Sequence, residues 1–224
     1  MTFFPKETDF IDIHSHQTEL GEGVFRIHNV FTSGFSNIRT DAPVSIGLHP
    51  WHISNDSIIE LADVIKKAAS LDNLMAVGEA GLDRMINTPV EQQMSVFRTQ
   101  IELSIELNKP LIIHCVRAFP ELFGLRKEYT KATSWIVHGF SASPAIAAEC
   151  VKKGIYISLS QRLFRNPDKA LKVARAVPIS MVFAETDEDP LPVTEIYNII
   201  AGYYGLSLSA VKGVLFDNFQ RVFC

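Results

Sequence analysis

The chain has 224 residues, of which 47% are hydrophobic and 21% charged, and its formal net charge at pH 7 is −4. This length suits one domain with a sizeable core and excludes a mini-protein that depends on disulfides. A bare duplex-DNA binder is usually basic, so the mild acidity argues against binding by surface charge alone. A nuclease whose positive charge comes from bound metal stays compatible with it.

The cysteines and the N-terminal segment bear on where the protein works. Cys115, Cys150 and Cys224 are an odd number without the spacing of a metal site, which predicts a reducing cytoplasm. The N-terminal segment MTFFPKETDF lacks the basic start and apolar run of a signal peptide. No apolar stretch reaches the length of about 18 residues that a membrane helix needs. We therefore expect a cytoplasmic protein with no membrane association and no obligate protein partner.

Short apolar runs alternate with longer helix-like segments along the whole chain. Continuous apolar runs are typical of strands buried on both faces, as in a parallel sheet covered by helices. The expected strands are Phe10–His14, Gly23–Val30, Val44–Leu48, Leu74–Glu79, Leu111–His114, Trp135–His138, Ile155–Leu159 and Met181–Glu185. The expected helices are 57–70, 90–108, 118–130, 144–153, 168–176, 193–204 and 208–222.

Two connections have their own signals. Thr88-Pro89 resembles a cap followed by proline in the first turn of the helix over 90–108. Residues 31–43 are too few and too polar for a full helix.

The alternation predicts the fold class α/β, as a (β/α)8 TIM-like barrel formed by a single domain over residues 1–224. The active site of such a barrel lies at the C-terminal ends of its strands. An open doubly wound sheet is the structural alternative, weakened because no G-x-G-x-x-G motif follows an early strand.

The D-I-H-S-H run at residues 12–16 is the first candidate for chemistry. His14 and His16 are two residues apart on an extended chain, so their side chains point to the same face and both can reach one cation. Asp12 shares that parity, either as a hydrogen-bond partner behind the site or as a buried polar residue deeper in the barrel.

Four further metal-ligand residues follow apolar runs, namely Glu79, His114, His138 and Asp187. Burying a charged carboxylate is costly unless it is paired or metal-bound, so core packing does not explain this recurrence. Four imidazoles and two carboxylates are enough for two divalent ions. We expect zinc, manganese or magnesium; mixed nitrogen and oxygen donors suit zinc and manganese, and pure oxygen sites suit magnesium.

In this order the motifs resemble those of the TatD-type metal-dependent hydrolases, the TatD-related DNases of the amidohydrolase-like superfamily. The matching motifs are D-I-H-S-H, I-G-L-H-P-W, V-G-E-A-G-L-D, I-I-H-C-V-R-A, V-H-G-F-S, A-E-T-D and D-N-F-Q-R-V-F. The resemblance implies that His14 and His16 hold one metal with Asp187, that Glu79 bridges both metals, and that His114 and His138 hold the second. The chain departs from the family at Arg84, Gln161 and the segment 188–190, which belong to substrate loops.

The resemblance also implies an activity, the hydrolysis of phosphodiester (ester) bonds as an exonuclease-type deoxyribonuclease acting on DNA. Metal ions in such a site make water available as a nucleophile at neutral pH. Catalysis is assigned to Asp187, which would orient this water and accept its proton, and to Glu79. The expected substrate-binding residues are His49, Asp83, Arg117 and Arg162.

Several alternatives stay open. His49 either contacts a substrate phosphate or packs on Trp51 as a loop histidine, and Asp83 either lines the pocket or caps the segment after Gly81. Arg162 either contacts phosphate or is an exposed charge. The same metal site could cleave amide or aminoacyl-ester bonds, since loops set barrel chemistry. A non-catalytic binding protein is the remaining alternative. A nucleic-acid strand or another phosphodiester is the expected substrate.

Overall fold

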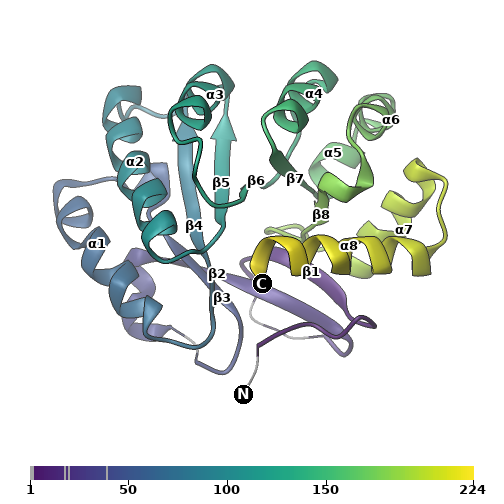
Figure 1. Cartoon of the computed structure of the whole chain (residues 1–224), viewed down its shortest axis with the longest axis horizontal. Helices are drawn as coiled ribbons and strands as arrows, with labels where there is room; N and C mark the ends of the chain where they lie inside the picture. Colours follow the sequence, from purple (N-terminus) through teal and green to yellow (C-terminus); the bar gives the residue numbers. More distant parts are fainter. Residues whose placement is uncertain (1–2, 18, 20, 39) are drawn as a thin grey trace. The chain divides into compact units, whose positions relative to one another are not determined.

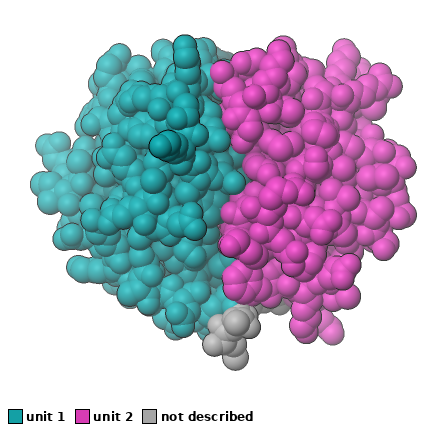
Figure 2. Space-filling view, viewed as in Figure 1, with its two compact units in different colours: residues 1–3, 29–136 teal, residues 4–28, 137–224 magenta. Residues whose placement is uncertain are grey.

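The structure is a computed structural model that describes residues 3–17, 19, 21–38 and 40–224. Strands and helices alternate along the chain (Figure 1). The residues form two compact units, which Figure 2 shows in different colours. The first unit holds Phe3 and residues 29–136, and the second unit holds residues 4–28 and 137–224. The chain passes between the units after Phe3 and within strands β2 and β6.

The first unit contains parallel strands that follow one another in chain order. Its strands are the end of β2 (Val24–Phe31), β3 (Val44–Gly47), β4 (Leu74–Asp83), β5 (Leu111–Val116) and the start of β6 (Trp135–Val137). Its helices are η1 (Thr32–Asn37), η2 (Pro50–His52), α1 (Asn55–Ala69), α2 (Val90–Glu106) and α3 (Phe119–Glu128).

Strand β4 is longer than the sequence predicts. It was expected to end at Glu79, but it continues to Asp83 and stays paired with β5, with Gly81 opposite His114. Gly81 has φ +149, and a Cβ atom there would lie 2.0 Å from the carbonyl oxygen of His114. Glycine at this position therefore lets the two strands approach so closely. As a result Glu79 and Asp83 project from one strand.

The second unit contains the end of β6, β7 (Ile155–Leu159), β8 (Val182–Ala184), β1 (Phe10–Ser15) and the start of β2. Its helices are α4 (Pro144–Lys152), α5 (Gln161–Phe164), α6 (Pro167–Ala176), η3 (Ile179–Met181), α7 (Val193–Tyr204) and α8 (Leu208–Phe223). Strands β7 and β8 pair in parallel, as do β1 and β2.

The end of β8 is joined to β1 through an isolated parallel bridge between Ser15 and Asp187. The backbone N–H of Asp187 donates to the carbonyl of His14 at 3.0 Å, and the N–H of His16 donates to the carbonyl of Asp187 at 3.1 Å. These bonds fix the first and last strands of the chain side by side in the second unit.

The strands are hydrogen-bonded in chain order, β1 to β8, and helices separate them along the chain. The fold class is therefore α/β of the (β/α)8 type, as predicted, and the doubly wound alternative is wrong because its strand order departs from chain order. The assignment of residues 1–224 to a single domain stays a prediction.

Smaller predictions had mixed outcomes. Residues 31–43 hold only the short η1, as expected. The Thr88 cap is wrong, because Pro89 is the N-cap of α2 and the carbonyl of Thr88 accepts from the side chain of Gln93. Strand β8 is shorter than expected, since Met181 belongs to η3.

Within the described residues, no individual helix combines the length and apolar character that crossing a membrane requires. Helices α7 and α8 meet these two criteria only as a pair, with a bend of 103° between them.

Candidate functional site

In the second unit, three predicted ligands lie together: His14 on β1, His138 after β6 and Asp187 after β8. One potential ligand atom from each lies within 4.8 Å of the other two, and we call these residues the His14 group. The rings of His14 and His138 have centroids 4.3 Å apart, and Nε2 of His14 lies 3.8 Å from Oδ1 of Asp187. Two imidazoles and one carboxylate are a donor set that suits zinc and similar divalent ions.

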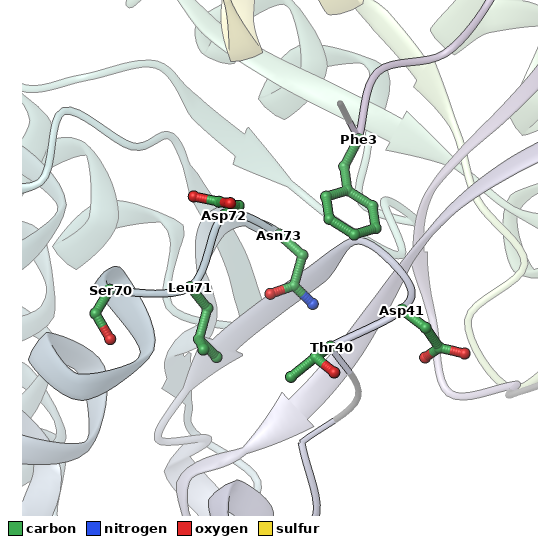
Figure 3. A pocket seen from close by; sticks show the side chains of 7 residues that line it. All are labelled: Phe3, Thr40, Asp41, Ser70, Leu71, Asp72 and Asn73. Carbon is green, nitrogen blue, oxygen red and sulfur yellow. The ribbon is translucent and has the colours of Figure 1, made fainter. Parts of the chain in front are cut away.

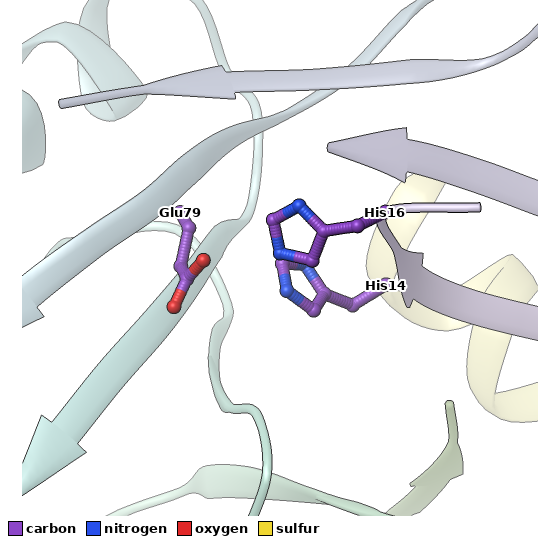
Figure 4. Close-up of side chains that lie close together, drawn as sticks. All are labelled: His14, His16 and Glu79. Carbon is purple, nitrogen blue, oxygen red and sulfur yellow. The ribbon is translucent and has the colours of Figure 1, made fainter. Parts of the chain in front are cut away.

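His16 lies beside this group. Figure 4 shows the imidazoles of His14 and His16 on the same side of β1 and its extension, as the two-residue spacing predicts, and their centroids are 5.3 Å apart. Nε2 of His16 lies 3.6 Å from Oδ1 of Asp187. The carboxylate of Asp187 therefore faces both histidines of the D-I-H-S-H run.

The local backbone explains how Asp187 reaches these histidines. Its φ is +54, in the left-handed region that few residues other than glycine, asparagine and aspartate adopt. The backbone bonds to His14 and His16 on either side stabilise this conformation. The strained turn thus brings the carboxylate back toward β1 instead of continuing β8.

Asp12 is a hydrogen-bond partner behind the site, as one alternative from the sequence expected, because it bonds Thr186, the residue before Asp187, as well as Arg26. Its Oδ2 accepts from Nε of Arg26 at 2.9 Å and from the hydroxyl of Thr186 at 2.7 Å, and Oδ1 accepts from the Thr186 N–H at 3.0 Å. Burial raises the pKa of Asp12 to about 6, against the lowering effect of Thr186 and Arg26. The buried Asp12 thus fixes Thr186, the residue that precedes Asp187, through hydrogen bonds to its backbone and side chain.

Glu185 lies behind His138. It is fully buried, its Oε1 accepts a hydrogen bond from the N–H of Gly139, and the same oxygen lies 3.5 Å from Nδ1 of His138. A carboxylate on one imidazole nitrogen orients the ring and leaves the other nitrogen for a metal. Glu185 faces Nδ1 of His138, an arrangement that would leave Nε2 to bind metal.

In the first unit, Glu79 on β4 lies between two imidazoles. Its Oε1 is 3.2 Å from Nε2 of His49 and 3.0 Å from Nδ1 of His114, and all three residues are buried. Ligand atoms of these residues also lie within 4.8 Å of one another, and we call them the Glu79 group. The sequence placed Glu79 and His114 in the metal site but assigned His49 to substrate.

The hydrogen bonds of His49 indicate which tautomer its imidazole adopts. The backbone N–H of Trp51 donates to Nδ1 of His49 at 3.2 Å. A neutral imidazole carries one proton, so with Nδ1 accepting, Nε2 carries the proton and donates to Glu79. In this form His49 is a hydrogen-bond donor to Glu79. The ring of His49 packs against that of Trp51 with centroids 5.0 Å apart, as one of the two alternatives expected. Its contact with a substrate phosphate stays a prediction.

Asp83 lies on the other side of His114. Its Oδ2 is 3.2 Å from Nε2 of His114 and accepts from the indole N–H of Trp51 at 2.8 Å, while Oδ1 accepts from the N–H of Met85. Burial would raise the pKa of Asp83, but the hydrogen bonds from His114, Trp51 and Met85 outweigh it and lower the pKa to about 2. The ionised carboxylate holds Nε2 of His114, which leaves Nδ1 facing Glu79.

Two buried glutamines that the sequence analysis did not single out position these strand ends. Gln93 and Gln100 lie seven residues apart on α2 and so share one face. Gln93 accepts from the N–H of Asp83 and donates to its carbonyl, at 2.7 and 2.9 Å. Gln100 does the same for Leu48, the residue before His49, at 2.8 and 3.0 Å. The only sequence signal is a polar side chain on an apolar helix face.

Arg117 and Arg162, the predicted substrate cations, are both exposed. Within the described part of each unit, no hydrogen bond or ion pair joins either arginine to a candidate ligand. Arg162 lies on the short helix α5, and its neighbour Arg165 instead pairs with Asp189 at 2.8 Å. Their role in substrate binding stays a prediction.

A pocket of about 480 Å³ lies elsewhere in the first unit (Figure 3). Its lining includes Asp41, Asp72 and Asn73, next to the beginnings of β3 and β4. The Glu79 group lies toward the opposite ends of these strands, so this pocket is separate from the candidate ligands.

Comparison with known proteins identifies the relatives of the chain. Residues 35–224 match the model of the TatD-related DNase family. YabD of Bacillus subtilis, an uncharacterized metal-dependent hydrolase, is 29% identical over 80% of this chain and 76% of its own length. A putative deoxyribonuclease of Mus musculus, TATDN3, is 30% identical over 68% of this chain and 56% of its own.

A solved structure supports the same assignment at the level of the fold. The TatD homologue YjjV of Escherichia coli has a TM-score of 0.79 at 20% identity, covering 97% of this chain and 99% of its own. Because the family model spans most of the sequence, the chain belongs to the TatD-related DNase family and is a metal-dependent hydrolase.

Proposed function

We propose that the protein is a metal-dependent phosphodiesterase that degrades DNA as an exonuclease-type deoxyribonuclease. The observation that carries the proposal is the His14 group, in which two buried imidazoles and the Asp187 carboxylate converge within ligand distance of one another. The deoxyribonuclease name of one relative and of the matched family supports the choice of substrate.

We propose that His14, His16, His138 and Asp187 provide the ligands in the second unit, and Glu79 and His114 those in the first. Divalent metal bound by such residues polarises phosphoryl oxygens and lowers the pKa of water toward neutrality. Two ions, with Glu79 as the bridging ligand, stay a prediction from the family resemblance, as does the choice among zinc, manganese and magnesium.

The surrounding residues have supporting roles. Asp187 orients the attacking water and accepts its proton, because its carboxylate is partly open to solvent while its backbone is fixed by β1. Asp83 orients His114 through Nε2, and Glu185 faces Nδ1 of His138, so that the other nitrogen of each ring would bind metal. His49 donates to Glu79 through Nε2 in the metal-free form. Once Glu79 binds metal, this N–H can turn to a substrate oxygen instead.

A substrate panel tests the proposal. The metal-loaded protein is offered a DNA strand, a small phosphodiester, an amide and an aminoacyl ester of matched size. We expect cleavage of both phosphodiesters, loss of about 100-fold or more in His14→Ala, and little change in the matched control His28→Ala. Cleavage of the amide or aminoacyl ester alone would overturn the proposal and establish the other bond class. Metal binding without cleavage of any substrate would indicate a binding protein.

A further inference from the structure

Trp51 is held in one orientation by a hydrogen bond although most of its surface is exposed to solvent. The residue is 63% exposed, yet its indole N–H donates at 2.8 Å to Asp83, which is only 2% exposed. A large side chain held in one orientation loses conformational entropy. Because Trp51 is mostly exposed, the hydrophobic effect offsets little of this loss. The indole is therefore pre-positioned with a free apolar surface.

The position of this ring relates it to the Glu79 group. The Trp51 ring centroid lies 5.0 Å from that of His49 and 6.1 Å from that of His114, with interplanar angles of 87° and 74°. Met85 donates to the same carboxylate through its backbone N–H, and this residue is 59% exposed. Two exposed apolar residues are thus hydrogen-bonded to Asp83, Trp51 through its indole and Met85 through its backbone, beside residues that the proposed function assigns to metal binding.

We infer that Trp51 is a stacking platform for a nucleobase of the strand whose phosphodiester is cleaved. This inference rests on the proposed function and narrows its substrate to base-bearing strands with an unpaired base at the site. Aromatic side chains bind single-stranded nucleic acid because every base offers a π-face, and one stack strengthens binding about 5- to 100-fold. Stacking requires an unstacked base, so strand ends and single strands are preferred over duplex interiors.

The chain contains a built-in reporter for this contact. It has two tryptophans, and the other one, Trp135, is fully buried. With a hydrolysis-resistant phosphorothioate oligothymidylate and the Mg²⁺-loaded protein, we expect quenching of Trp51 emission. An abasic oligomer of equal length should bind without this change, and Trp51→Phe, which retains only Trp135, should show none with either oligomer. Equal quenching by both oligomers, or unchanged emission when anisotropy shows that the oligothymidylate is bound, would overturn the inference.

Kinetics separate stacking from an indirect effect through Asp83. Trp51→Phe keeps an aromatic face but loses the indole N–H, whereas Trp51→Ala loses both. We expect the preference in kcat/KM for a base-bearing over an abasic strand to fall about 5- to 100-fold in Trp51→Ala and to stay largely intact in Trp51→Phe. The exposed Ile59 on α1, 77% exposed, provides the control Ile59→Ala, which should keep the preference.

If both Trp51 variants lower cleavage of the two strands equally, Trp51 acts only through Asp83 and the stacking role is wrong. Absence of phosphodiester cleavage in the wild type would instead contradict the proposed function. The fluorescence result does not depend on turnover, so the two failures are distinguishable.

Discussion

Nε2 of His114 lies 3.2 Å from Oδ2 of Asp83, so the second nitrogen of this imidazole is held by a buried carboxylate. Asp83→Asn keeps the size of the side chain but removes the charge that fixes the ring. We expect divalent-metal affinity to fall about 10- to 100-fold, measured by Co²⁺ titration of the absorption band of the bound metal. The exposed Asp56 on α1 offers the control Asp56→Asn, and equal affinities in both variants would show that Asp83 does not orient His114.

The buried pair of Asp12 and Arg26 predicts a loss of stability when it is broken. Arg26→Met leaves the Asp12 carboxylate buried without its cation, which costs about 3–5 kcal/mol of the free energy of unfolding. The double variant with Asp12→Asn should recover part of this loss in denaturant unfolding. Lys66 and Glu106 form an exposed pair, so Lys66→Met should cost at most about 1 kcal/mol. A loss no greater in Arg26→Met than in Lys66→Met would contradict the role given to the buried pair.

Gln100 predicts a second, smaller loss of stability. Gln100→Leu removes both hydrogen bonds to the Leu48 backbone and leaves its N–H and carbonyl buried without these partners. We expect the free energy of unfolding to fall by about 2 kcal/mol or more. Gln92 on the same helix is partly exposed, so Gln92→Leu should change it by less than about 0.5 kcal/mol. Indistinguishable unfolding midpoints for the two variants would mean that Gln100 does not hold this strand end.

The thiols predict an ordered pattern of chemical labelling. Burial, together with the charge of Glu149, raises the pKa of Cys150 to about 12, while Cys224 is exposed. Only the thiolate reacts, and its fraction at Cys150 near pH 8 is about one in ten thousand, rising tenfold per pH unit. Mass mapping after thiol labelling at pH 8 should find Cys224 modified and Cys150 modified only after unfolding. Comparable labelling of both in the native protein would be inconsistent with a buried Cys150.

The sequence predicted most of the framework because the buried strands are continuous apolar runs. The segment Leu111–His114 is such a run, and β5 begins where it does. The His14–His16 spacing also predicted a shared face correctly. The extension of β4 to Asp83 was missed because V-G-E-A-G-L-D contains two glycines, which usually weaken a strand, whereas here Gly81 allows close contact with β5.

Other features of the site depend on contacts between residues far apart in the chain. One partner of Asp12 is Thr186, 174 residues away, and no local pattern encodes that pairing. The proton form of His49 follows from a backbone N–H two residues on, which becomes an available donor only because the chain turns into η2. In the sequence, Gln93 and Gln100 look like ordinary helix residues. Their hydrogen bonds to the backbones of Asp83 and Leu48 form only because α2 packs against these strand ends.

The most direct test of the account is DNA hydrolysis by metal-stripped protein to which Mn²⁺ or Zn²⁺ is returned, compared between the wild type and Asp187→Asn. We expect no hydrolysis by the stripped wild type, recovery as metal is added, and a loss of about 100-fold or more in Asp187→Asn with unchanged thermal unfolding of the metal-free protein. Full activity of the stripped protein, or of Asp187→Asn, would contradict a metal-dependent phosphodiesterase built on these residues.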